Sequence, residues 1–208
     1  MPDAIVTARL ELRPGTPDQL RASIGPTDAL AAALSCRVPP DWPPLHWEAG
    51  PVDWLLARLA DEPGEPFWRA WFMLWKPGNE RDDRADEPGR TGPEPTLVGT
   101  VGFKGPPGRP GSETDGVVEI GYSVVNSFHR RGIASEAVAA MLEWAGADAR
   151  VRTFRAHTLA DDPASAGVLL KNGFQLVATI DDPDDGRVDR YDRRTESTSH
   201  RPSVPPPD

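Results

Sequence analysis

Residues 129–137 read HRRGIASEA: a histidine and two arginines come before two small residues and the start of a helical pattern. Small residues let a ligand approach the backbone, and arginines suit a ligand that carries phosphate. A helix N-terminus adds unpaired N–H groups and a partial positive charge. The stretch predicts an anion-binding turn whose amide groups come from residues 130–135. The alternative is a solvated turn into a surface helix, and the neighbouring segments must decide between the two.

Those neighbouring segments alternate between strands and helices. In the residues that follow the turn, the spacing of Val138, Met141, Leu142 and Ala145 places them on one face of a helix. This order of elements predicts a mixed α/β sheet. The expected strands are 8–13, 67–75, 96–104, 116–124 and 152–159. Further helices are expected at 27–37, 52–60 and 163–172. Two last strands, 174–180 and 187–193, are expected to pair in a hairpin about residues 184–186.

Three segments are poorly suited to packing. Residues 77–95 and 104–116 are charged and rich in proline and glycine, so we expect two long loops there. Residues 195–208 are polar and end in prolines, so we expect a disordered tail. Much of the chain's 24 prolines lies in these segments, which leaves a folded part of ordinary composition.

Composition excludes several classes of function. A net charge of -9 argues against non-specific nucleic-acid binding, which requires Lys and Arg to neutralise phosphates. No apolar run reaches the ~18 residues of a membrane span, and charges interrupt the first 13 residues where a signal peptide would need an apolar stretch. We therefore expect a cytoplasmic protein without a membrane partner. Cys36 is the single cysteine and the four histidines lack ligand spacing, so no metal is expected.

The turn does not fit the common dinucleotide motifs, since neither G-x-G-x-x-G nor G-x-x-x-x-G-K-[ST] is present. With its neighbours it resembles the GNAT superfamily of N-acetyltransferases, particularly the branch that acetylates ribosomal-protein N-termini. The resemblance rests on EIGYSV (119–124), HRRGIASEA and AHTLADDPASAGVLLKNGF (156–174), in the family's order, and on the opening TARLELRP (7–14). It implies a GNAT domain over residues 7–193, with 77–95 and 104–116 as insertions. The implied fold is a mixed, mostly antiparallel sheet, splayed at the cofactor site and flanked by helices.

The resemblance implies acetyl-CoA as co-substrate, with its pyrophosphate as the anion at the turn. The family pattern there is Gln or Arg, two variable residues, Gly, one variable residue, then Gly or Ala. Gly132 and Ala134 match the small positions, whereas His129 replaces the usual first residue. The implied cofactor-binding residues of the turn are Arg130, Arg131, Gly132, Ile133, Ala134 and Ser135.

Two further stretches are implied to contact the cofactor. The backbone of Tyr122, Ser123 and Val124 would lie along the pantetheine arm, and Gly121 is consistent with a bulge in that strand. Asp162 and Ser165 occupy the remaining cofactor-binding positions, although a helix cap explains Ser165 equally well.

The third stretch departs from the family pattern at two positions. The family usually has Asn where Asp162 stands, and many members have Tyr, the acid for the leaving thiol, where this chain has Leu169. These departures keep a second interpretation open: a non-catalytic acyl-CoA-binding or regulatory module of the same fold.

His157 and Glu119 are the candidate catalytic residues. His157 lies where related enzymes carry a catalytic Glu, and a histidine titrates near neutral pH. We expect His157 to be the base, with Glu119 holding the substrate ammonium or a water. The structural alternatives are a hydrogen-bonded core histidine and a salt bridge at the sheet edge.

The acceptor pocket is expected from residues 35–54, where Trp42, Trp47 and Trp54 would form its walls. Alternatively, these tryptophans anchor the segment to the core. The implied reaction is direct acetyl transfer to a primary amine, belonging to a small molecule or to a protein N-terminus. The sequence does not separate these acceptors, and it leaves a homodimer open.

Overall fold

The computed structural model describes residues 4–76, 94–183 and 186–195. Within these residues the chain forms one eight-stranded sheet of order β1-β2-β3-β4-β5-β6-β8-β7. Neighbouring strands run antiparallel, except that β5 and β6 are parallel. The strands are β1 (Ile5–Val6), β2 (Leu10–Pro14), β3 (Ala70–Trp75), β4 (Thr96–Phe103), β5 (Val117–Val124), β6 (Thr153–Leu159), β7 (Gln175–Asp182) and β8 (Gly186–Arg194). The predicted mixed, mostly antiparallel sheet is confirmed.

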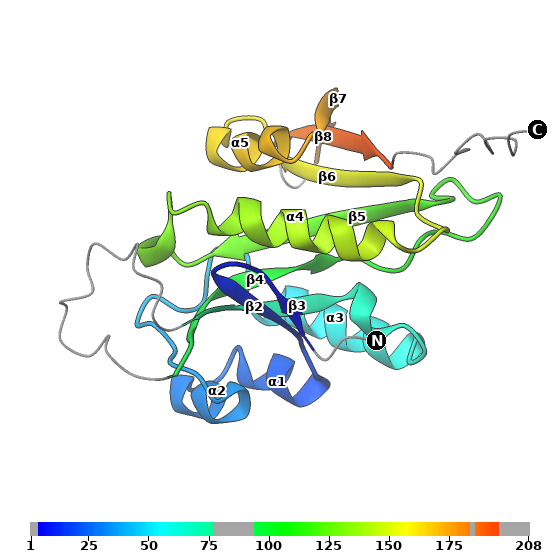
Figure 1. The fold of residues 1–208 in the computed structure, drawn as a ribbon. Helices are drawn as coiled ribbons and strands as arrows, with labels where there is room; N and C mark the ends of the chain where they lie inside the picture. Colours follow the sequence, from blue (N-terminus) through cyan, green and yellow to red (C-terminus); the bar gives the residue numbers. More distant parts are fainter. Residues whose placement is uncertain (1–3, 77–93, 184–185, 196–208) are drawn as a thin grey trace, which may run out of the picture.

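Helices cover both faces of this sheet (Figure 1). The α-helices are α1 (Pro17–Ala22), α2 (Thr27–Leu34), α3 (Ala49–Asp61), α4 (Ile133–Gly146) and α5 (Pro163–Lys171), and two 3-10 turns are η1 (Pro66–Trp68) and η2 (Asn126–Phe128). None of the helices in the described ranges is long and apolar enough to cross a membrane.

Strand β3 lies in the middle of the core, and each of its six residues is buried. The ring of Trp71 lies 5.6 Å from that of Trp144 in α4, whereas the ring of Phe72 lies 6.3 Å from that of Trp47. Because successive side chains of a strand point to opposite faces, α4 covers one face and the segment around Trp47 covers the other. A strand buried on both faces explains its continuous apolar run.

Strands β5 and β6 diverge along their length. They pair only from Val117 to Glu119 against Thr153–Arg155. Beyond this point β5 stays paired with β4 up to Val124, and β6 stays paired with β8 up to Leu159. The predicted splay of the sheet is therefore present, and it opens directly after Glu119.

Most predicted elements are observed with small shifts at their ends, but several details differ. Helix α1 was not predicted, although Thr16 and Gln19 form a capping box at its start. The bulge expected at Gly121 is wrong, because the register between β4 and β5 is unbroken. The strand expected at 67–75 begins at Ala70, because the 3-10 turn η1 occupies the residues before it.

The predicted loops have different outcomes. Residues 104–116 connect β4 to β5 as predicted, and the loop is held where Gly111 N donates to Asp115 over 3.0 Å. Most of the expected loop 77–95, the centre of the turn at 184–186 and nearly all of the tail lie outside the described residues. The insertions and the disordered tail therefore stay predictions.

Candidate functional site

The turn before α4 has the backbone conformation of an anion-binding site. Arg130 and Gly132 both have positive φ, at 60° and 74°, and Gly132 is the N-cap of α4. No side chain of the described residues caps this helix, so the N–H groups of its first turn, which begins with Ile133, Ala134 and Ser135, keep their hydrogen-bonding capacity. An anionic group fits that arrangement.

Contacts with the end of β5, with Arg9 and with Phe128 of η2 hold the turn in place. The Nε2 atom of His129 lies 2.8 Å from the carbonyl oxygen of Val124, at the end of β5. Arg9 donates from Nη1 to the carbonyl oxygen of Arg131 over 2.7 Å, and the Arg131 guanidinium stacks over the ring of Phe128 at 4.9 Å. The family's Gln or Arg is thus replaced by a histidine that ties the turn back to the strand.

Glu136 connects α4 to the start of the sheet. Its carboxylate accepts hydrogen bonds from Thr7 Oγ1 at 2.5 Å, from Arg9 N at 2.8 Å and from Arg9 Nε at 2.6 Å. Burial raises the pKa of Glu136, but these donors outweigh burial and hold the net pKa below its ordinary value. Glu136 is therefore a structural carboxylate that holds the start of α4 against Thr7 and Arg9.

The backbone of β5 presents alternate residues to the splay. Lys104 N donates to Glu119 O over 2.8 Å and Val125 N donates to Val98 O over 3.0 Å, so odd-numbered residues of this stretch face β4. By the same alternation, the main-chain groups of Tyr122 and Val124 face the opening toward β6. Ser123 instead turns its main chain to β4, and its Oγ donates to Leu45 O over 2.8 Å.

Three of the predicted cofactor residues meet where β5 faces the start of α5. The Tyr122 hydroxyl lies 3.0 Å from Ser165 O and 2.9 Å from Ser165 Oγ. Asp162 caps α5 by accepting from Ala164 N and Ser165 N, each at 3.0 Å. Burial raises the pKa of Tyr122 to about 12, so its hydroxyl stays protonated at neutral pH. Leu169 is fully buried, as expected of a core residue.

The two candidate catalytic residues are brought together where the strands begin to diverge. Nδ1 of His157 lies 3.0 Å from Oε1 of Glu119, and the same oxygen forms an ion pair with Lys104 Nζ. Burial raises the pKa of Glu119. The hydrogen bond and charge of Lys104, together with the contact with His157, outweigh burial and hold the net pKa below its ordinary value. A carboxylate shifted in this direction is a weak base, which favours His157 for that role.

A cavity of about 590 Å³ lies between α3 and the sheet, beside the main chain of residues 121–123. Gly102 and Gly121 sit opposite each other on its floor, and a Cβ on Gly121 would find nothing within 4 Å. Trp47 and Trp54 line the cavity, as expected. Trp42 does not: it is buried, and its Nε1 donates to Ser23 O over 2.9 Å, so it anchors the segment to the core.

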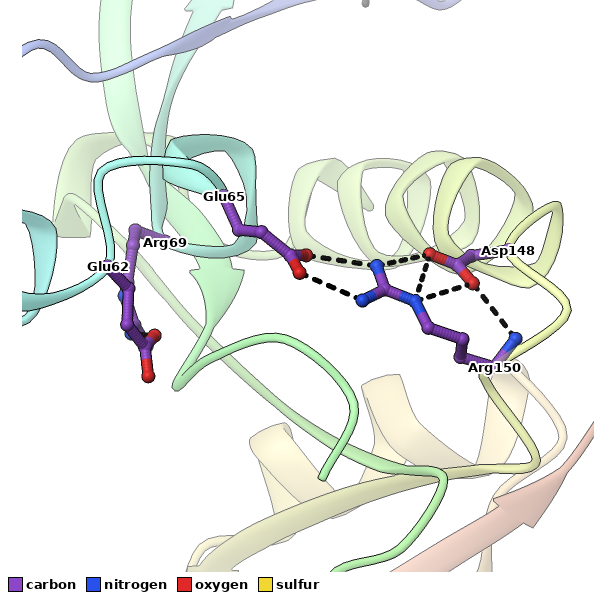
Figure 2. Close-up of polar contacts among 5 residues, drawn as sticks. All are labelled: Glu62, Glu65, Arg69, Asp148 and Arg150. Carbon is purple, nitrogen blue, oxygen red and sulfur yellow. Dashed lines mark hydrogen bonds and ion pairs between the residues drawn. The ribbon is translucent and has the colours of Figure 1, made fainter. Parts of the chain in front are cut away.

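Arg69 and Lys104 form the wall between this cavity and a second one of about 610 Å³. The Arg69 guanidinium pairs with Glu62, donates to Lys104 O and lies 5.9 Å from the ring centre of Trp54. Beyond the Glu62–Arg69 pair, Arg150 binds Glu65 and Asp148 together (Figure 2). Six basic and three acidic residues line the second cavity, and each of the three carboxylates is paired with an arginine of the lining.

Sequence reasoning missed three side chains at the site. Lys104 ends the predicted strand 96–104, but its contact with Glu119 depends on a register set across a long loop. Arg69 is 3% exposed, although arginine is seldom buried. His46 lines the cavity with φ at 61°, a conformation that non-glycine residues rarely adopt. The signal for these residues lies in the tertiary contacts.

Comparison with known proteins agrees with this geometry. A family model described as "Acetyltransferase (GNAT) domain" matches residues 9–175. No curated protein matches the chain in sequence.

Solved structures are similar along nearly the whole chain. A RimL ribosomal L7/L12 alpha-N-protein acetyltransferase in complex with coenzyme A has a TM-score of 0.61 and 18% identity, over 92% of this chain and 97% of that chain. The ribosomal-protein-S5-alanine acetyltransferase from Vibrio fischeri has a TM-score of 0.60 and 13% identity, over 93% and 97%. The microcin C7 self-immunity acetyltransferase MccE, in complex with acetyl-CoA and AMP, has a TM-score of 0.58 and 12% identity, over 90% and 93%. At these identities the likeness establishes the fold.

Proposed function

Because the chain belongs to the acetyltransferase (GNAT) domain family, we propose that it is an acetyl-CoA-dependent N-acetyltransferase that moves the acetyl group directly to a primary amine. One observation carries the proposal: the His157–Glu119 pair lies where β5 and β6 diverge. This position supports His157 as a base beside the strand edge that is proposed to bind the cofactor. The proposed domain spans residues 7–193.

The described residues fit acetyl-CoA at two places. The uncapped first turn of α4 behind Gly132 suits the pyrophosphate, and Arg130 and Arg131 adjoin it. The main-chain groups of Tyr122 and Val124 face the splay and suit the amides of an extended arm. Solved relatives of this fold carry coenzyme A or acetyl-CoA, which supports the same ligand.

Each residue then has a defined task. Acetyl-CoA supplies the acetyl group as an activated thioester. His157 accepts the proton of the acceptor amine, and Glu119 orients its ring through Nδ1. A main-chain N–H near Val124 stabilises negative charge on the carbonyl oxygen. A thiolate with a pKa of about 8.5 can leave without a dedicated acid, so Leu169 is compatible with turnover.

The acceptor is a small-molecule amine or a protein N-terminus. Solved relatives of the same fold act on ribosomal proteins L7/L12 and S5, which supports a protein acceptor. The cavity of about 590 Å³ has the size of a small-molecule site and supports the other acceptor. We propose that the protein is cytoplasmic, that it has no nucleic-acid or membrane partner, and that it needs no metal. The proposal is compatible with a monomer and with a homodimer.

The test combines cofactor binding with thiol release. Calorimetric titration should show binding of acetyl-CoA, and release of coenzyme A should depend on an added amine drawn from a panel that includes N-terminal peptides. Binding without release by any amine would instead support the non-catalytic acyl-CoA module, which the replacement of the thiol acid by the buried Leu169 favours. Absence of binding would overturn both functions.

A further inference from the structure

The charges around the cavity between α3 and the sheet point to the chemistry of the acceptor. Its lining is mainly apolar and aromatic, with Trp47, Trp54, Leu55 and Phe103 among the largest side chains. Such surfaces bind rings and aliphatic groups through burial and stacking. An acceptor that fills this cavity therefore has an apolar or aromatic body.

The ionisable groups of the lining differ in sign from the protein as a whole. The chain carries a net charge of -9, yet the charged side chains that line the cavity are those of Arg69 and Lys104. In the part of the chain that the structure describes, no aspartate or glutamate belongs to the lining. A cavity of this composition attracts anions and repels a second positive charge.

The nearest carboxylates do not reverse this polarity. Glu119 is paired with Lys104, and Glu62 is paired with Arg69. An anionic ligand competes with Glu119 for Lys104, whereas an amine that carries a second positive charge meets two cations and no carboxylate in the described lining. The Lys104 side chain is 64% exposed, so its ammonium can turn from Glu119 toward an anionic group of a ligand.

We propose that this cavity selects a small acceptor amine with an apolar or aromatic body and an anionic group, and that Lys104 recognises the anion. The inference rests on the proposed acetyltransferase function. Arg69 is paired with Glu62 and lies against the ring of Trp54, so Lys104 is the cation of the lining that a ligand can contact directly. Lys104 is thus the specificity-determining residue, and the polycationic acceptors are excluded by charge.

The experiment measures acetyl transfer to four probes: tyramine, its phenol phosphate ester O-phosphotyramine, tyrosine, and spermidine. The phosphate of O-phosphotyramine lies at the far end of the molecule from the amine, and the carboxylate of tyrosine lies beside the amine, so two placements of an anion are sampled. At least one anionic probe should exceed tyramine in kcat/KM by about 10-fold, equivalent to about 1.4 kcal/mol, and spermidine should fall below tyramine. This preference should shrink as salt is added.

Lys104→Met keeps an unbranched apolar side chain that is one atom shorter, and it removes the charge. Loss of Lys104 also affects Glu119, so the readout is the ratio of anionic to neutral probes within the same variant. The ratio should fall toward one in Lys104→Met and stay unchanged in Lys171→Met, a solvent-facing control on α5.

Calorimetric titration of the full chain with the same four probes gives the ratio of affinities for the anionic and the neutral probes, independently of turnover. Turnover or binding in which tyramine or spermidine equals both anionic probes would overturn the inference and leave the proposed function intact. Binding of the anionic probes without acetylation of any amine would support the cavity's selectivity while refuting the enzyme.

Discussion

Nδ1 of His157 lies 3.0 Å from Oε1 of Glu119, although the two residues are 38 positions apart and lie on parallel strands that separate just beyond this contact. A carboxylate accepts hydrogen bonds, so Glu119 fixes Nδ1 as a donor and leaves Nε2 as the nitrogen that can accept a proton. This arrangement supports the proposed role of His157 as the base.

His157→Ala should lower kcat at neutral pH by about 100-fold or more, because general-base catalysis typically contributes that much. The Kd for acetyl-CoA should be unchanged. Glu119→Gln keeps an oxygen for Nδ1 and should cost much less. If Glu119→Gln eliminates turnover while His157→Ala leaves kcat unchanged, the two roles are reversed.

Gly132→Ala and Gly132→Val should weaken acetyl-CoA binding at least 10-fold. A side chain at φ +74° is strained by about 1–2 kcal/mol, and its Cβ would also crowd Arg9, 3.4 Å away. The melting temperature should fall by a few degrees. Gly50→Ala in α3, with open space around its Cβ, should retain cofactor affinity. Calorimetry with normal affinity in both Gly132 variants would refute the anion-binding turn.

Asp162 provides a matched pair of substitutions at the start of α5. Asp162→Asn can keep the cap on Ala164 and Ser165 while removing a charge near the cofactor, so affinity for coenzyme A should rise or stay level. Asp162→Ala should lose about 1 kcal/mol of stability with the cap. Denaturant unfolding and calorimetry separate the two effects, and a clear loss of affinity in Asp162→Asn would show that the carboxylate contacts the cofactor directly.

Gly121→Val should fill the floor of the acceptor cavity without disturbing the strand. Its Cβ meets nothing within 4 Å and valine favours strands, so the melting temperature and the Kd for acetyl-CoA should be preserved. The kcat/KM for the amine should fall about 10-fold in Gly121→Val. The kcat/KM of Gly121→Ala should lie between those of the wild type and Gly121→Val. Unchanged kinetics in both variants would place the acceptor elsewhere.

Glu136→Gln should destabilise the fold at neutral pH by about 1.5–3 kcal/mol, because charge-assisted bonds from Thr7 and Arg9 are weakened. The folded-state pKa of Glu136 lies below its unfolded value of about 4.3, so its carboxylate stabilises the protein above that pH. This contribution is lost as pH falls through the folded-state pKa. The wild-type and variant unfolding curves should therefore converge in acid, and an equal gap at pH 3 and pH 7 would contradict the assignment.

Local patterns gave most of the elements in this chain. The face formed by Val138, Met141 and Leu142 predicts α4, and all three are buried. The unbroken apolar run predicts β3, and Gly173 adopts φ +78° after α5. These features depend on side chains a few residues apart, for which spacing and turn chemistry suffice. The short helix α1 was missed because six residues carry little periodicity, although its Thr16 and Gln19 signature was present.

The sequence by itself determined the family, most of the strands and helices, and the glycine turn before α4. It also supplied His157 and Glu119 as the candidate catalytic residues. Only the tertiary structure decided what those residues meet. Lys104 reaches Glu119 through a register that bridges residues 104–116, which lie outside the strands, and Arg69 and His46 reach the cavity from segments far away in the chain. Side-chain periodicity is a local property, whereas register, burial and ion pairing are settled by which faces pack together, so the charge of the acceptor cavity emerges only in the folded chain.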